Sequence, residues 1–246
     1  MEKQETLLNL KEDLKELKRR VCTCVAIFIL AFVVCLWKAE FLVNKMLDMG
    51  SGYYNFAYLY PQEVFIQYLG VSFVGALIVI VPVIVLEIGL FLYPALYPSE
   101  KKGFIIGSIS ACILLYAGMT FAIKIMIPFM LRYFAEINAG VSNAEGMVSI
   151  EKYISLIKAM CLAFSVTFEL PVFSSLFGMI GILKSEWMKK FRKPAIVLIF
   201  IVAAFITPPD VTSQFMVAVP TIVLYQISIW IVATIEKKRK GKEESE

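Results

Sequence analysis

The 246-residue sequence contains no histidine. This absence excludes Ser-His dyads, histidine acid–base catalysis and HExxH zinc sites. The chain also lacks a GxxxxGKS or GxxxxGKT motif, so no P-loop binds a nucleotide, and it lacks the CxxC pairs from which many metal sites are built. We therefore expect a protein that is not an enzyme, uses no metal or cofactor, and works by binding or moving something.

Cysteine is scarce and poorly placed for a disulfide framework. The odd count argues against full pairing, and the two nearest cysteines, in VCTCV, are too close for a CxxC redox pair. Packing as small apolar side chains is the expected role. The five positions, all within apolar segments, are Cys22, Cys24, Cys35, Cys112 and Cys161.

Long apolar runs dominate the rest of the chain. Hydrophobic residues make up 59% of the sequence, whereas soluble domains have roughly 45–50%. A transmembrane helix needs roughly 20 mostly apolar residues, although the fifth run has only about 16 and would let the bilayer thin locally. We expect an all-α polytopic membrane protein with six transmembrane helices, the fifth and sixth short, in a concave bundle. The runs are residues 21–37, 64–97, 103–131, 159–183, 194–209 and 211–235.

Positive charges are distributed unevenly between the loops. Eighteen of the 24 lysines and arginines fall in residues 1–20, 101–102, 184–193 and 237–242, whereas the alternate loops hold five. Because cytoplasmic loops are rich in lysine and arginine, both termini are predicted to be cytoplasmic. The net charge of +4 then reflects rims that face anionic lipid, and no nucleic-acid role is expected.

Three regions follow from this pattern. Residues 1–20 form a cytoplasmic amphipathic leader, 21–235 the six-helix transmembrane domain, and 236–246 a charged cytoplasmic tail. The leader is acid-rich and is followed by no small-x-small cleavage pattern, so it is not expected to be a cleavable signal peptide. Its leucines recur at helical spacing. The leader is therefore either an interfacial helix or a segment that offers Glu16 to a basic ligand.

Glu169 is the only charged residue in the run 159–183. A charged side chain at the centre of a bilayer costs roughly 2.5–3.5 kcal/mol even on the gentler insertion scale. Two explanations remain open. Glu169 can lie beside a wet concave pocket and bind a polar side chain of a partner, or it can be protonated and bonded to a neighbouring helix.

Two turns carry further candidate residues. In LYPALYPSEKKG, Pro94 and Pro98 stiffen the link between the second and third helices, and Glu100 is either a helix-start acid or a ligand-binding acid. In FITPPDVTSQF, the tandem prolines end the fifth helix, and Asp210 or Thr212 can cap the sixth.

Five blocks of sequence together resemble one family. FSVTFELP lies at 164–171, and FRKPAIVLIFIVAAFITPPDVTSQFMVAVPTIVLYQ at 191–226. DLKELKRR at 13–20 resembles the pattern HLxELRxR, residues 94–102 resemble PGLYxxE followed by basic residues, and 61–65 match P-x-E-x-F. These blocks look like the signature of TatC, the multi-spanning subunit of the twin-arginine protein translocase.

The chain departs from the usual family pattern at six positions. Five of these changes alter charge or size, and the sixth replaces a frequent glutamate, which removes any role for a carboxylate there. The departures are Asp13 for His, Lys18 for Arg, Gly70 for Lys, Ala95 and Ser165 for Gly, and Gln226 for Glu.

The resemblance implies a receptor and core subunit of a twin-arginine translocase in the bacterial cytoplasmic membrane. Such a subunit binds twin-arginine signal peptides of folded cargo at the cytoplasmic face, and works in an oligomeric complex with single-span TatA- and TatB-type partners. Two alternatives remain, a six-helix secondary transporter that moves a small solute with Glu169, and a scaffold without a transport role.

The resemblance also implies three groups of site residues. The signal-peptide-binding group is Glu16, Lys18, Arg20, Pro94, Leu96 and Glu100. The intramembrane, partner-binding group is Phe168, Glu169, Pro171 and Gln214. The external turn is Pro208, Pro209 and Asp210.

Overall fold

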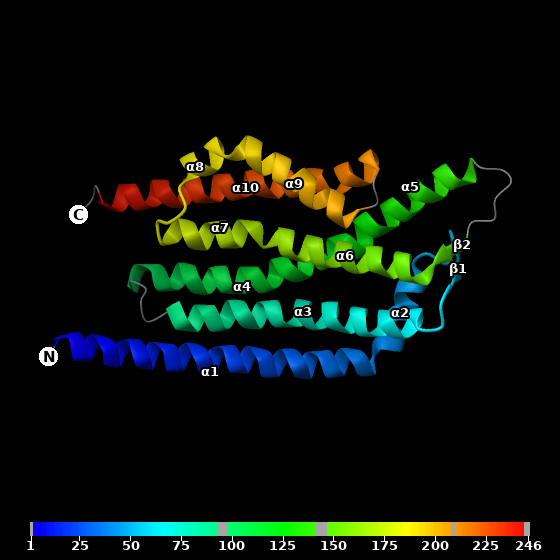
Figure 1. The fold of residues 1–246 in the computed structure, drawn as a ribbon. Coiled ribbons are helices and arrows are strands. Elements are labelled where there is room, and N and C mark those ends of the chain that lie inside the picture. The colour runs from blue at the N-terminus through cyan, green and yellow to red at the C-terminus, as the bar shows by residue number, and fades with distance from the viewer. Residues whose placement is uncertain (1, 93–97, 141–146, 208–209, 244–246) are drawn as a thin grey trace.

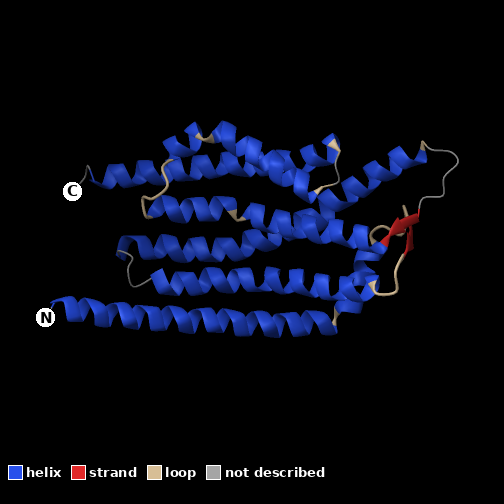
Figure 2. Ribbon diagram, in the orientation of Figure 1, coloured by secondary structure: helices blue, strands red, loops and turns tan. Residues whose placement is uncertain are grey.

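The computed structural model of this chain is an elongated helical bundle with one small pair of strands (Figures 1 and 2). It describes the backbone of residues 2–92, 98–140, 147–207 and 210–243, and the side chains of 15–87, 105–140, 147–207 and 210–238. Within these ranges the α-helices are α1 (Glu2–Trp37), α2 (Ala39–Asp48), α3 (Glu63–Leu92), α4 (Pro98–Phe121), α5 (Ile127–Ala139), α6 (Ile150–Phe168), α7 (Leu170–Met179), α8 (Ser185–Lys190), α9 (Arg192–Ile206) and α10 (Val211–Glu243). A π-helical turn, η2 (Ala122–Met126), joins α4 to α5, and the strands are β1 (Asn55–Ala57) and β2 (Met147–Ser149).

The long helices lie side by side along one axis, which gives the bundle two distinct ends (Figure 1). The start of α1, the end of α3, the start of α4, α8 and the end of α10 lie at one end, which we call the terminal end. The pair α2 and β1–β2, with the end of α5, lies at the other, which we call the strand end.

Five segments are long and apolar enough to cross a membrane. The short fifth helix expected from the sequence is α9, whose 15 residues span about 22 Å, less than the roughly 30 Å hydrocarbon core. The chain is therefore a multi-pass membrane protein with five full-length candidate spans among its described residues and one shorter apolar helix. The five segments are Lys15–Trp37, Glu63–Glu87, Ile105–Ala139, Ile150–Met179 and Val211–Lys238.

The last helix differs from the expectation of a short sixth helix. α10 is 33 residues long and continues through the charged sequence KKRKGKE. Lysine, arginine and glutamate are good helix formers, so the helix continues after the apolar run stops. Glu236 strengthens this extension, because its carboxylate accepts hydrogen bonds from the backbone N–H and the hydroxyl of Ser185 at the start of α8. At the other terminus, the boundary expected at residue 20 lies inside the continuous helix α1.

The run 159–183 does not form one straight helix. α6 ends at Phe168, α7 begins at Leu170, and Glu169 lies between them. Pro171 explains the break, because it has no N–H for the carbonyl of Thr167 and its ring clashes with that carbonyl. Pro128 also lacks an N–H for the preceding turn, and it follows the π-helical turn η2. α5 bends away from the axis of α4 at this turn (Figure 1).

A close approach of α4 and α6 forms the centre of the core. A Cβ atom at Gly118 would lie 2.5 Å from the backbone oxygen of Phe164 and 2.9 Å from the Cβ of Phe168, so only glycine fits there. Phe121, one turn further along α4, packs against both phenylalanines with ring centroids 5.3 Å and 5.4 Å away. These contacts fix the position of α6 immediately before the break at Glu169.

The strand end is held by paired backbone and by two tyrosines. β1 and β2 pair in parallel, with Phe56 opposite Val148. The hydroxyl of Tyr153 in α6 donates to the carbonyl of Met46 in α2 at 2.9 Å, and that of Tyr54 donates to the carbonyl of Leu131 in α5 at 2.8 Å. Burial raises the pKa of Tyr54, so its hydroxyl remains a donor at neutral pH.

Candidate functional site

Glu16, Arg20 and Glu87 form a charged cluster at the terminal end of the bundle. The Nε and Nη2 atoms of Arg20 donate to Oε1 of Glu16 at 3.1 Å and 2.6 Å. The Nη1 atom donates to Oε2 of Glu87 at 2.8 Å. We call these three residues the Arg20 cluster. One guanidinium therefore connects two carboxylates from two helices.

The cluster results from helical spacing and the packing of α1 against α3. Glu16 and Arg20 are four residues apart, so they lie on one face of α1. Glu87 lies 67 positions later in the sequence, near the terminal end of α3. The side chains are 40%, 16% and 22% exposed for Glu16, Arg20 and Glu87, which places the cluster at a rim that solvent reaches. A fork of N–H donors suits carboxylates in this geometry.

Among the other predicted members of the signal-peptide group, only Lys18 has a described side chain. Lys18 is exposed on α1. Glu100 lies in the first turn of α4, and its side chain is outside the described part of the chain. Pro94 and Leu96 lie outside the described residues. The structure thus brings Glu16 and Arg20 together and adds Glu87, while the start of α4 lies at the same end of the bundle (Figure 1).

Sequence reasoning did not identify Glu87 as part of this group. The signal available was its isolation, since it is the only acidic residue between 64 and 97. Its pairing with Arg20 depends on the register between α1 and α3, which periodicity within either helix does not reveal.

Glu169 is buried at the break between α6 and α7. These two helices meet about midway along the bundle (Figure 1). Its side chain is 1% exposed, and neither carboxylate oxygen has a hydrogen-bond partner among the described residues. The carboxyl group lies near the backbone of Leu115 in α4. The hydroxyl of Ser165, one turn earlier, is also buried without a recorded partner in this part of the chain.

This burial corrects the expectation of a wet concave pocket at Glu169. The close packing of α6 on α4 at Gly118 excludes solvent from that face. Phe168 and Pro171 lie on either side of Glu169 in the sequence. Phe168 packs on Phe121, and Pro171 ends α6. A carboxyl group in these surroundings must be protonated or must meet a donor from outside the described residues.

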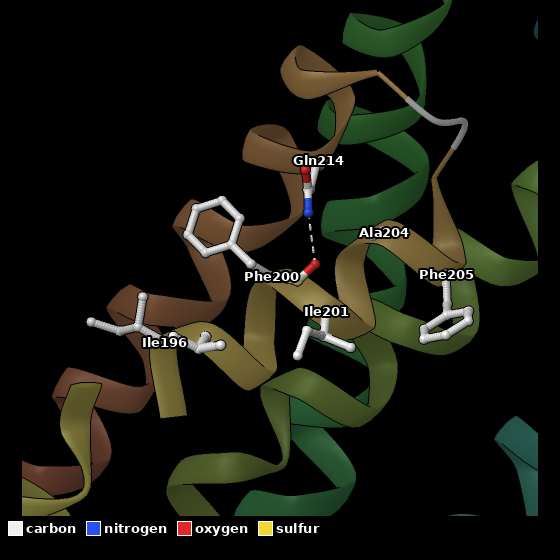
Figure 3. Close-up of a pocket in the computed structure, with 7 residues that line it drawn as sticks. Ile196, Phe200, Ile201, Ala204, Phe205 and Gln214 are labelled. Atoms are coloured by element: carbon white, nitrogen blue, oxygen red, sulfur yellow. Dashed lines mark hydrogen bonds between the residues drawn. The ribbon is translucent and has the colours of Figure 1, made fainter. Parts of the chain in front are cut away.

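Gln214 lies at the edge of a groove between α9 and α10 (Figure 3). Its Nε2 atom donates to the carbonyl of Phe200 at 2.8 Å, which joins the two helices. The groove has a volume of about 480 Å³ and is otherwise apolar. Phe205, at its rim, is 88% exposed. Its other lining residues are Ile196, Val197, Phe200, Ile201 and Ala204.

Asp210 caps α10 at the junction with α9. One carboxylate oxygen accepts the backbone N–H of Ser213 at 2.8 Å, and the other is bonded to the hydroxyl of the same serine. This is the N-cap geometry, in which a carboxylate satisfies an unpaired N–H of the first turn. Pro208 and Pro209, the other residues of the predicted turn, lie outside the described residues.

Three comparisons relate nearly the whole chain to known proteins. A family model described as TatC, Sec-independent protein translocase protein, matches residues 12–220. The TatC protein of Helicobacter pylori is 33% identical over 237 residues, covering 96% of this chain and 91% of its own length. The TatC protein of Rickettsia prowazekii is 30% identical over 240 residues, covering 95% of this chain and 96% of its own.

A solved structure has the same fold. The crystal structure of a twin arginine translocase receptor, TatC, superimposes with a TM-score of 0.78 at 27% identity. The match covers 91% of this chain and 99% of the solved one. The motifs, the helical bundle and these matches agree along nearly the whole length. This chain belongs to the TatC family of Sec-independent protein translocase proteins.

Proposed function

We propose that this chain is the receptor and core subunit of a twin-arginine translocase in a bacterial cytoplasmic membrane. It binds twin-arginine signal peptides at the terminal end of the bundle, which faces the cytoplasm, and it organises single-span partners for the export of folded proteins. A small-solute transporter built around Glu169 is not retained, because the family consists of protein translocase subunits.

The Arg20 cluster is the observation that carries the proposal. An arginine side chain already occupies Glu16, one of the two acids expected to bind a signal arginine, together with Glu87. The geometry therefore accepts a guanidinium, whose N–H groups donate to two carboxylates from two helices. An arginine of the signal peptide binds by replacing Arg20 on Glu16, and the released Arg20 stays close enough to return when the cargo leaves.

Glu100 supplies the acceptor for the second arginine of the pair. It lies in the first turn of α4 at the same end of the bundle. Basic residues next to both acids, such as Lys18 and Lys101, weaken the attraction for a positively charged peptide. This balance suits a cargo that must be released.

Binding of a labelled twin-arginine peptide to the full chain in lipid nanodiscs tests the proposal. The same peptide with both arginines replaced by lysine should bind more weakly, because an ammonium cannot form the paired bonds of a guanidinium. Glu16→Gln and Glu100→Gln should each weaken binding by about tenfold or more. Lys102→Gln at the same end is the control and should not weaken it. Unchanged binding in the Glu16→Gln, Glu100→Gln double variant would rule out the assignment.

The partner subunits bind where polar groups lie within apolar surroundings. Gln214 of α10 lies at the edge of an exposed apolar groove lined by the short helix α9. Glu169 is buried, so a partner bonds its two oxygens, which have no described donor, only when the helices around it part. A single-span helix with one polar side chain matches such surfaces, since a polar group in a membrane seeks a hydrogen-bonding partner. Gln214→Leu should reduce co-purification of single-span partners, whereas Val219→Leu, an exposed apolar change on the same helix, should not.

A further inference from the structure

A second cavity lies at the strand end, away from the proposed signal and partner sites. It is enclosed by α2, α3, α6 and the segment α4–η2, and its volume is about 160 Å³. Apart from two lysines, the lining is aliphatic or contains sulfur, with Met46, Met49, Val74 and Met119 among its residues. A cavity of roughly 150 Å³ with aliphatic walls stays dry and binds benzene. The expected occupant is therefore a hydrocarbon segment rather than water.

Two lysines contribute their aliphatic stems to the lining, which is wholly apolar, so their ammonium groups lie outside the cavity itself. Lys45 of α2 is exposed, and Lys158 of α6 is half-buried. The Nζ atom of Lys158 turns toward the strand end and donates to Oε1 of Gln67 in α3 at 2.8 Å. It lies over Gly70, where an added Cβ would be only 2.5 Å away. An ammonium has three N–H donors, and Gln67 is the one acceptor recorded for it among the described residues.

The cavity has the depth of half a bilayer. α3 starts at Glu63, so Gln67 lies about 6 Å along the helix and Ile78, at the deep end of the cavity, about 22 Å along it. Trp37, 83% exposed at the end of α1, marks the interfacial level of the neighbouring α2. The ammonium group of Lys158, bonded to Gln67, thus lies near the headgroup level, and the apolar part reaches the middle of a hydrocarbon core of roughly 30 Å.

We propose that this cavity binds an anionic glycerophospholipid of the leaflet at the strand end. The phosphate binds Lys45 and the free donors of Lys158, and part of one acyl chain enters the apolar portion. Charge complementarity and depth select this occupant, because such a lipid carries its negative charge and its hydrocarbon at the matching levels. No acidic residue lines the cavity within the described part of the chain, and Glu151, seven positions before Lys158, is exposed.

Native mass spectrometry of the full chain tests the proposal, with phosphatidylglycerol and phosphatidylcholine of identical acyl chains as probes. Phosphatidylglycerol should be retained more strongly and should raise the midpoint of thermal unfolding. Lys45→Gln and Lys158→Gln should each weaken its retention by about fivefold. Lys152→Gln, an exposed change on the same helix as Lys158, should have no effect. Lys45 is itself exposed, so its variant tests the charge beside the cavity without disturbing the fold.

The hydrocarbon part needs its own variant. Val74→Phe fills the apolar portion and should reduce retention of phosphatidylglycerol while both lysines remain. Soluble glycerol phosphate at the same concentration should not raise the unfolding midpoint. Equal retention of the two lipids, undiminished retention by the Lys45→Gln, Lys158→Gln double variant, or an equal shift with glycerol phosphate would each overturn the proposal.

Discussion

Arg20 of α1 and Glu87 of α3 are 67 positions apart in the chain, yet Nη1 of the arginine lies 2.8 Å from Oε2 of the glutamate. The same guanidinium also bonds Glu16 through Nε and Nη2. Arg20 thereby connects the leader half of α1 to the terminal end of α3.

Removal of the arginine tests whether it competes with the signal peptide. We expect Arg20→Gln to tighten binding of a twin-arginine peptide several-fold, because both carboxylates lose their internal partner. Arg19→Gln, one position earlier and exposed, should leave the affinity nearly unchanged. Peptide titration of the three proteins gives the comparison, and weaker binding by Arg20→Gln would show that Arg20 itself holds the peptide.

Substitutions at Glu169 separate a partner-binding carboxyl group from a structural one. Glu169→Leu removes a buried polar group without a described partner and should raise the free energy of unfolding by about 1–3 kcal/mol. We expect the same variant to lose export, because a partner that reaches this position when the surrounding helices part has no polar group to bond. Glu169→Gln keeps hydrogen-bonding atoms and should retain most export. Both variants should bind the signal peptide normally, and full export by Glu169→Leu would remove the functional role.

The contact of α4 with α6 depends on the absence of a side chain at Gly118. Gly118→Ala would place its Cβ 2.5 Å from the backbone oxygen of Phe164, so the helices must separate. We expect a loss of about 1–3 kcal/mol in the free energy of unfolding, the range for an overpacked core. Gly52→Ala is the matched control, since nothing lies within 4 Å of the new atom. Thermal unfolding in detergent measures both, and equal midpoints would contradict the tight packing.

The orientation in the membrane is accessible to cysteine labelling. In a variant without the native cysteines, a cysteine at Lys190 in α8 should react only from the cytoplasmic side, and cysteines at Ser51 and Glu136 only from the outside. All three positions are exposed, so accessibility depends on the side of the membrane rather than on burial. Labelling of Lys190→Cys from outside would invert the predicted topology.

The sequence predicted the helices well where a run of apolar residues was the main determinant. Runs of about 20 apolar residues lie inside α1, α3, α4 and α10, because in a membrane a helix satisfies its own backbone hydrogen bonds. The break at Glu169 was missed, although Pro171 was visible two residues later. The apolar run masked it, since hydropathy does not register a missing backbone donor.

The site was predicted less completely, because its parts come from different helices. Glu16 and Arg20 share one helical face and were both identified from the leader motif. Glu87 was not, since only the packing of α1 on α3 brings it to Arg20. The burial of Glu169 has the same origin, because Gly118 on α4 determines how closely that helix covers it.

The strand end has a mechanical consequence for the whole bundle. The pairing of β1 with β2, together with the bonds from Tyr153 to Met46 and from Tyr54 to Leu131, ties three separate helices at one end. Among the described residues the terminal end is tied by the Arg20 cluster and by the bonds from Ser185 to Glu236 and from Tyr225 to Met188. The two ends join different helices: the strand end links α2, α5 and α6, whereas the terminal end links α1 to α3 and α8 to α10. Loss of the link between α1 and α3 at the terminal end would therefore leave every described tie of the strand end in place.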